Sequence, residues 1–185
     1  MFRTASLKKG AKGFTLIELL IVIGIIGILA AIILVAVDPA KRLKQSRNAR
    51  RFAETNAILN AILNYTVDYK GTLPSAVLSA TTGQAVIIGS GYAFAPLPET
   101  FCPASATGAN AATNTRDLAA DAALVSAYIA EIPVDPRGFN DNGDLYDSTV
   151  TGYYLIRSAN GRLEVGSCNP ESEDGVTTPT IKIKR

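Results

Sequence analysis

A long, almost purely apolar run lies near the N-terminus. From Phe14 to Val37 the only ionisable residue is Glu18. About 20 apolar helical residues are enough to cross a bilayer, so the run predicts a membrane-spanning helix. A carboxylate in such a helix costs roughly 2.5–3.5 kcal/mol at the bilayer centre and less near its surface. We therefore expect Glu18 to have a partner that offsets this cost.

Helical patterning continues after an interruption at Asp38-Pro39. Pro39 lacks an N–H and clashes with the preceding turn. The helix therefore either bends there, or Asp38 caps a second helix that begins at Pro39. The segment from Ala40 to Tyr69 has no Gly or Pro, and its apolar residues recur at helical spacing. Those residues are Phe52, Ile58, Leu59, Ile62, Leu63, Tyr65 and Tyr69. Gly71 and Pro74 predict its end.

The remaining pattern predicts one further helix and several short strands. Residues 86–88 and 92–94 are short apolar stretches in a segment rich in Ser, Ala, Thr and Gly, and they predict strands. Thr115 is the predicted cap of a helix from Arg116 to Glu131, with Leu118, Val125, Tyr128, Ile129 and Ile132 on its apolar side.

The C-terminal segment carries the pattern of a β-hairpin. Residues 151–158 and 162–165 predict two strands joined by a two-residue turn at Asn160-Gly161. Residues 181–184 alternate apolar and Lys positions, which is typical of a protected edge strand. The fold class is therefore α+β, with a long N-terminal helix packed on a small antiparallel sheet.

Charge is distributed unevenly along the chain. Residues 1–13 carry four basic residues and no acid, and a second basic cluster occupies residues 41–51. We interpret that cluster as a solvated helix face or an inter-subunit salt-bridge surface; a collar on anionic lipid is the alternative. From Gly71 onward twelve acidic residues stand against seven basic ones, so no nucleic-acid partner is expected.

Candidate chemistry is sparse. The chain has no histidine, which removes the commonest general base and most zinc and haem sites, so we predict no enzyme and no cofactor. Acidic side chains gather between Asp135 and Asp147, as in calcium-binding loops, but the spacing does not match an EF-hand. We interpret this stretch as a hydrated turn and predict no metal site, with calcium as the alternative.

The chain has two cysteines, Cys102 and Cys168. If this part lies outside the cytoplasm, one disulfide between them is the economical interpretation, and two buried free thiols are the alternative. Closing a loop of that length would contribute on the order of 4 kcal/mol in the chain-entropy model.

The stretch Lys12-Gly13-Phe14-Thr15-Leu16-Ile17-Glu18, preceded by a short basic leader, resembles the start of type IV prepilins and type II secretion pseudopilins. A plain signal anchor fits the hydropathy equally well but gives no reason for Glu18. The resemblance implies cleavage by a prepilin peptidase between Gly13 and Phe14, and methylation of the new N-terminus at Phe14. It also implies that Glu18 pairs with the amine of a neighbouring Phe14 in a filament.

The same resemblance predicts how the chain is divided and where it works. Residues 1–13 would be a cytoplasmic leader, 14–37 the transmembrane and filament-core helix, 38–70 its amphipathic second half, and 71–185 a globular pilin head. The subunit would sit in the inner membrane as a single-pass protein. It would then polymerise with other pilin subunits on an inner-membrane assembly platform into a periplasmic or extracellular filament. A pseudopilin of type II secretion and a membrane-anchored adhesin remain the alternatives.

Overall fold

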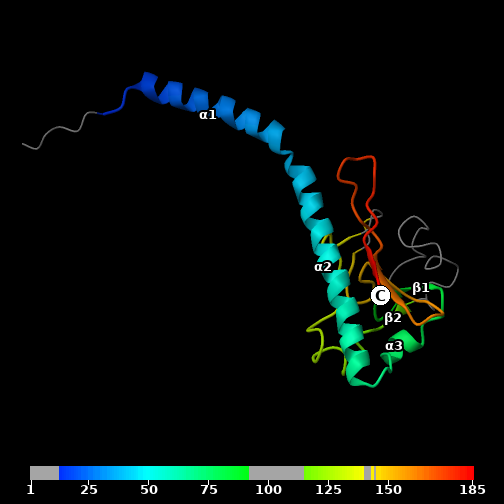
Figure 1. Cartoon of the computed structure of the whole chain (residues 1–185). Helices are drawn as coiled ribbons and strands as arrows, with labels where there is room; N and C mark the ends of the chain where they lie inside the picture. Colours follow the sequence, from blue (N-terminus) through cyan, green and yellow to red (C-terminus); the bar gives the residue numbers. More distant parts are fainter. Residues whose placement is uncertain (1–12, 92–114, 140–142, 144) are drawn as a thin grey trace, which may run out of the picture. The chain divides into compact units, whose positions relative to one another are not determined.

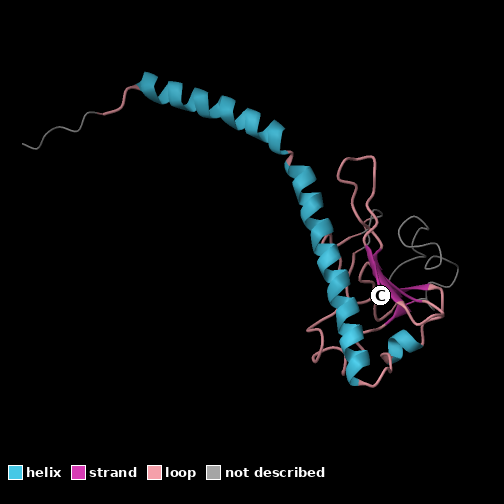
Figure 2. Cartoon of the chain, viewed as in Figure 1, coloured by secondary structure: helices cyan, strands magenta, loops and turns pink. Residues whose placement is uncertain are grey.

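The computed structural model describes residues 13–91, 115–139, 143 and 145–185. The chain divides into two units, Met1–Arg42 and Leu43–Arg185, and we call the second unit the head. Two long helices, one short helix and a five-stranded sheet make up the described part (Figures 1 and 2). The α+β class is therefore confirmed.

The predicted interruption at Asp38 is confirmed as a helix boundary. Helix α1 (Leu16–Val37) ends there because Asp38 adopts the left-handed conformation, with φ 42°. Helix α2 (Pro39–Asp68) begins at the next residue. Asp38 also caps α2, since its Oδ1 accepts from Lys41 N at 3.2 Å and Pro39 needs no acceptor for a missing N–H.

Helix α2 ends where Gly71 and Pro74 predicted. The N–H of Gly71 donates to the Thr66 carbonyl at 2.7 Å, and that of Lys70 donates to Val67 O at 3.3 Å. These are the two hydrogen bonds of a Schellman motif, with Lys70 in the left-handed region at φ 54°. The short helix α3 (Ser75–Leu78) follows Pro74.

The sheet has the strand order β2-β1-β3-β4-β5. Its members are β1 (Ala85–Ile88), β2 (Thr115–Arg116), β3 (Tyr153–Arg157), β4 (Leu163–Ser167) and β5 (Lys182–Lys184). The predicted antiparallel pairing holds for β1–β3, β3–β4 and β4–β5, but β2 runs parallel to β1, so the sheet is mixed. The last strand lies on the edge beside β4, as its alternating lysines predicted.

The hairpin between β3 and β4 is present, but its predicted turn is wrong. Ser158 N donates to Arg162 O at 2.8 Å, and Gly161 N donates to Ser158 O at 3.0 Å, which leaves a three-residue loop. Gly161 has φ 79°, whereas Asn160 is not among the non-glycine residues with positive φ. A two-residue type I′ turn needs positive φ at both positions, so the chain uses the longer loop.

The predicted helix from Arg116 to Glu131 is also wrong. Arg116 pairs with Ile88 in the parallel ladder, and Asp117 Oδ1 accepts from Ala119 N at 2.9 Å. Ser126 has φ 91°, which no α-helix accommodates. Burial of Leu118 and Leu124 is achieved by successive turns, so tertiary packing overrides the helical spacing.

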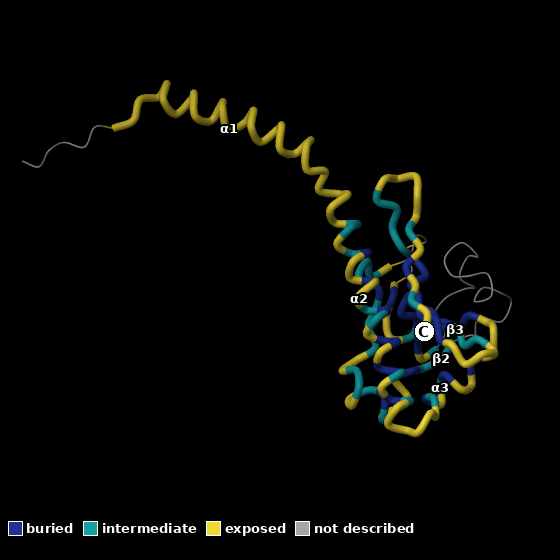
Figure 3. The backbone as a smooth tube through the Cα atoms, in the orientation of Figure 1, coloured by how far each residue is buried: buried dark blue, intermediate teal, exposed yellow. Residues whose placement is uncertain are grey.

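One face of the sheet packs against α2. Residues that alternate along β1, β3 and β4 join the helix in a single apolar core: Ile58, Leu59, Ile62, Val86, Ile88, Tyr153, Leu155, Leu163 and Val165. The opposite face carries a smaller cluster with Ala85, Ile87, Tyr154 and Cys168. Figure 3 shows this buried centre in dark blue.

Two glycines allow close approaches in this core. A Cβ on Gly166 would lie 2.5 Å from the Tyr154 ring, and one on Gly89 would lie 2.1 Å from the Thr149 carbonyl oxygen. Both positions therefore exclude larger residues, and the loop before β3 packs directly on the end of β1.

Candidate functional site: the N-terminal segment and the head ion-pair cluster

The start of α1 is closed by a reciprocal capping box. Thr15 is extended, and its Oγ1 accepts from Glu18 N at 3.2 Å. In return Glu18 Oε2 accepts from Thr15 N at 2.8 Å. This role was not predicted, although Thr15-Leu16-Ile17-Glu18 fits the S/T-x-x-E pattern. The carboxylate is therefore held close to the first turn, directly after the exposed Gly13 and Phe14.

Helix α1 has no buried residue, as its yellow tube in Figure 3 shows. It is the one helix among the described residues that is long and apolar enough to cross a membrane. An apolar surface of this extent needs a lipid or protein cover, because water does not stabilise it. No Asp, Lys or Arg lies between Leu16 and Val37.

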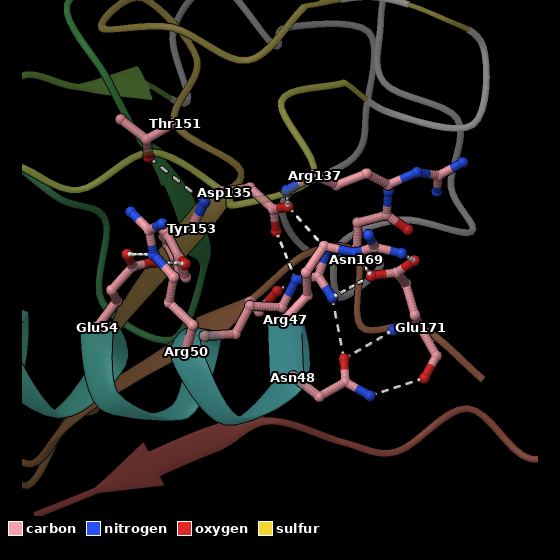
Figure 4. Close-up of polar contacts among 12 residues, drawn as sticks. Arg47, Asn48, Arg50, Glu54, Asp135, Arg137, Thr151, Tyr153, Asn169 and Glu171 are labelled. Atoms are coloured by element: carbon pink, nitrogen blue, oxygen red, sulfur yellow. Dashed lines mark hydrogen bonds and ion pairs between the residues drawn. The ribbon is translucent and has the colours of Figure 1, made fainter. Parts of the chain in front are cut away.

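In the head, Arg51 of α2 and Asp135 form a fully buried, two-pronged ion pair. Figure 4 labels Asp135 and several residues around it. Arg51 Nε donates to Asp135 Oδ2 at 2.7 Å, and its Nη2 donates to Oδ1 at 2.8 Å. Both side chains are 0% exposed. Asp135 is further fixed because its Oδ1 accepts from Arg137 N at 2.9 Å. Parallel N–H···O contacts of this kind are the strongest form of arginine–carboxylate recognition.

A second carboxylate, Glu171, joins the loop between β4 and β5 to the same helix. Arg47 donates to both of its oxygens at 2.6 Å, and Arg51 Nη1 donates to Oε2 at 2.9 Å. Asn48 completes the contact, since its Nδ2 donates to the Glu171 carbonyl at 2.8 Å and its Oδ1 accepts from Glu171 N at 3.0 Å. We call Arg47, Asn48, Arg51, Asp135 and Glu171 the ion-pair cluster.

A third contact lies one turn further along α2. Arg50 Nε donates to Glu54 Oε1 at 2.7 Å, and the Tyr153 hydroxyl donates to Glu54 Oε2. Burial, together with the bond to Glu54, raises the pKa of Tyr153 above its ordinary range. The tyrosine therefore stays protonated and acts as a donor at the centre of the core.

Comparison with known proteins gives two findings. The family model of the prokaryotic N-terminal methylation motif matches residues 8–34. The chain is also 36% identical over 99 residues to the type IV wide pilus major component PilA4 of Thermus thermophilus, a match that covers 54% of this chain and 68% of that protein. The chain belongs to the type IV pilin family. No solved structure gave a significant match to this pilin. Pilins are structural subunits, so this pilin is not an enzyme.

Of the two cysteines in the predicted disulfide, the structure describes Cys168. Cys168 is 4% exposed and disulfide-bonded. Its predicted partner, Cys102, lies outside the described residues, so the Cys102–Cys168 pair stays a prediction for this pilin.

The two acidic residues of the stretch 135–147 that the structure describes, Asp135 and Asp147, have separate partners. Asp135 is committed to Arg51, and Asp147 caps a turn by accepting from Thr149 N at 2.7 Å. Asp141, Asn142 and Asp144 lie outside the described residues. Within the part of this pilin that the structure describes, no group of three potential metal ligands occurs.

Three arginines of the basic cluster 41–51 form ion pairs within the chain, whereas the prediction was a solvated helix face or a salt-bridge surface between subunits. Arg47, Arg50 and Arg51 bind Glu171, Glu54 and Asp135 respectively. These arginines therefore hold this pilin's own head together, and a salt-bridge surface between subunits stays a prediction.

Acid is expected to destabilise the head through Glu171. Burial alone would raise the pKa of Glu171, but hydrogen bonds from Arg47 and Arg51 outweigh it and hold the pKa below its ordinary 4.5. A carboxylate with a depressed folded-state pKa stabilises the fold above its ordinary value and loses that contribution as the pH falls through the folded value. The urea midpoint of the full chain in detergent, followed by tyrosine fluorescence, should be level from pH 7 to about 5 and fall below about pH 4.5.

The matched variant for this measurement is Glu171→Gln. It should lower the midpoint at pH 7 and flatten its decrease in acid, because one titrating group is gone. A midpoint that stays constant to about pH 3 in the unmodified chain would contradict this assignment.

Proposed function

We propose that this chain is made as a prepilin, cut after Gly13, methylated on Phe14 and polymerised through α1 into a type IV pilus-like filament. The observation that carries the proposal is α1 itself, an entirely exposed apolar helix whose single charge sits in its first turn. A mere anchor would not need that charge, whereas a polymer in which Glu18 meets a cationic N-terminus would.

The geometry of Glu18 supports this pairing. Its Oε2 accepts both contacts from Thr15, and Oε1 accepts no hydrogen bond from the described residues. An amine of a neighbouring subunit could therefore bind Oε1 without opening the cap. Pairing offsets the several kcal/mol that each buried charge costs and fixes the register of adjacent subunits.

The proposal includes a route and partners. The basic residues of segment 1–13 would keep the leader in the cytoplasm and send the head outward. The prepilin peptidase would cut the leader while α1 (Leu16–Val37) spans the inner membrane as a single pass. An inner-membrane assembly platform would then move α1 from lipid into the core of the filament. The likeness to a pilus major component supports a pilus over a secretion pseudopilus.

The mature N-terminus is expected at Phe14. N-terminal sequencing and intact mass of protein from sheared filaments should show loss of residues 1–13 and one added methyl group. Gly13→Leu should block cleavage, because it places a bulky side chain directly before the bond that the peptidase cuts. Full-length protein should then remain in the membrane. Ala11→Leu, a change of similar size in the same leader, serves as the control and should be cleaved. Filament protein that begins at Met1 or near Val37 would refute the proposal.

A further inference from the structure

A polar cavity of about 290 Å³ opens beside the ion-pair cluster. Lys44 of α2, Arg137 and the loop after β4, with Asn169 and Glu171, line it. The cavity therefore joins the helix, the segment after Asp135 and the β4–β5 loop, three parts of the head that the ion-pair cluster already fixes.

The residues that line the cavity favour an anionic ligand. Glu171 is the one carboxylate in it, and both of its oxygens already accept from Arg47 and Arg51. Lys44 is half-buried and forms no ion pair with any residue that the structure describes. The guanidinium of Arg137 lies 4.9 Å from the centre of the Phe139 ring. The lining therefore holds two cations, Lys44 and Arg137, and the ammonium group of Lys44 is the one that we take as the partner of an anion in the cavity.

A buried side-chain N–H group in the cavity lining favours a ligand with an oxygen acceptor. Asn169 is 6% exposed, and its Nδ2 has no hydrogen-bond partner among the residues that the structure describes. A buried donor without an acceptor is destabilising, because it has lost its hydrogen bond to water. A carboxylate that enters the cavity would supply the acceptor and at the same time meet Lys44.

The head itself offers a complementary side chain. Among the side-chain carboxylates that the structure describes between residues 43 and 185, Glu131 alone has no hydrogen bond or ion pair, and it is exposed. All the others bind a donor within the head. Within the part of the head that the structure describes, Glu131 is therefore the acidic side chain that remains available to another molecule.

Glu131 and the cavity lie toward opposite ends of α2. Lys44 is near the start of this helix, and Glu131 follows Tyr128, whose hydroxyl donates to Asp68 Oδ2 at 2.6 Å in the last turn. From Lys44 to Asp68 the helix rises about 36 Å at 1.5 Å per residue. A second copy displaced along the helix direction could bring its Glu131 to this cavity. Such a contact joins different surfaces and does not close, so it builds a filament.

We propose that the cavity at Lys44 binds the Glu131 carboxylate of a neighbouring copy of this chain. The inference rests on the proposed polymerisation and deepens it, since it names a contact between heads in addition to the one between α1 helices. It assigns Lys44 as the cationic partner and Asn169 Nδ2 as the neutral donor.

The test is a charge exchange in the full chain, expressed in a cell that makes the filament. Lys44→Glu and Glu131→Lys should each lower the yield of sheared filaments by at least about tenfold, because each places like charges together. The double variant should recover most of the yield. Lys184→Glu, the same change on the exposed edge strand, should have little effect.

A second measurement tests the same contact without the charge variants, in case those variants do not fold. Lys44→Cys combined with Glu131→Cys should give disulfide-linked dimers and higher multimers in oxidised, intact filaments, and neither single variant should do so. Absence of these products in filaments, or a double charge variant as poor as the single ones, would overturn the inference while leaving the proposed function standing. Absence of filaments from the unmodified chain would instead refute the proposed function.

Discussion

Glu18→Gln is expected to abolish filaments while leaving the start of α1 capped. A glutamine oxygen can accept from Thr15 N as the carboxylate does, so the capping box survives. The negative charge is lost, and the Phe14 amine of the neighbouring subunit would be buried without a partner. Breaking a buried pair costs about 3–5 kcal/mol, which is a factor of roughly 10² to 4 × 10³ per contact. Filament counts by electron microscopy should fall to background, with the protein still in the membrane fraction.

Thr15→Ala is the matched control for this prediction. It removes the Oγ1 acceptor but keeps the charge, at a cost of about 1 kcal/mol for the lost cap. It should therefore reduce filament yield far less than Glu18→Gln does. The opposite ranking, with glutamine tolerated and Thr15→Ala defective, would show that α1 needs Glu18 as a cap and not as a charge.

The sequence was most informative where the pattern is local. The apolar run, the Asp38-Pro39 boundary, the hairpin and the edge strand each depend on neighbouring residues, and all four are present. The helix predicted for residues 116–131 is wrong although their apolar spacing suits a helix. The start of this segment pairs with β1, which is distant in the sequence. The spacing of apolar residues alone does not reveal that strand pairing competes with a helix.

The ion-pair cluster was missed for a different reason. Asp135 and Arg51 are 84 positions apart, and a distant partner leaves no local pattern. One signal was available on α2, because the buried positions form a stripe at spacings of three and four: Asn48, Arg51, Thr55, Ile58, Ile62 and Tyr65. The first three are polar residues on the extension of an apolar face. A charged residue in such a stripe predicts a buried partner.

Arg51→Met is expected to be the most destabilising single change in the head. It preserves much of the side-chain volume but leaves Asp135 buried with no cation, and it removes a donor from Glu171. We expect a loss of about 3–5 kcal/mol in the free energy of unfolding. Urea unfolding of the full chain in detergent, followed by near-ultraviolet circular dichroism of its seven tyrosines, would measure it.

Arg50→Met is the control, one residue earlier on the same helix. Its partner Glu54 keeps the hydrogen bond from Tyr153, and the Arg50 side chain is 65% exposed, so the loss should stay below about 1 kcal/mol. Asp135→Asn combined with Arg51→Met should be less destabilising than the sum of the two single changes, since the buried uncompensated charge is gone. Equal losses for Arg50→Met and Arg51→Met would mean that burial of the Arg51–Asp135 pair contributes nothing to the stability of the head.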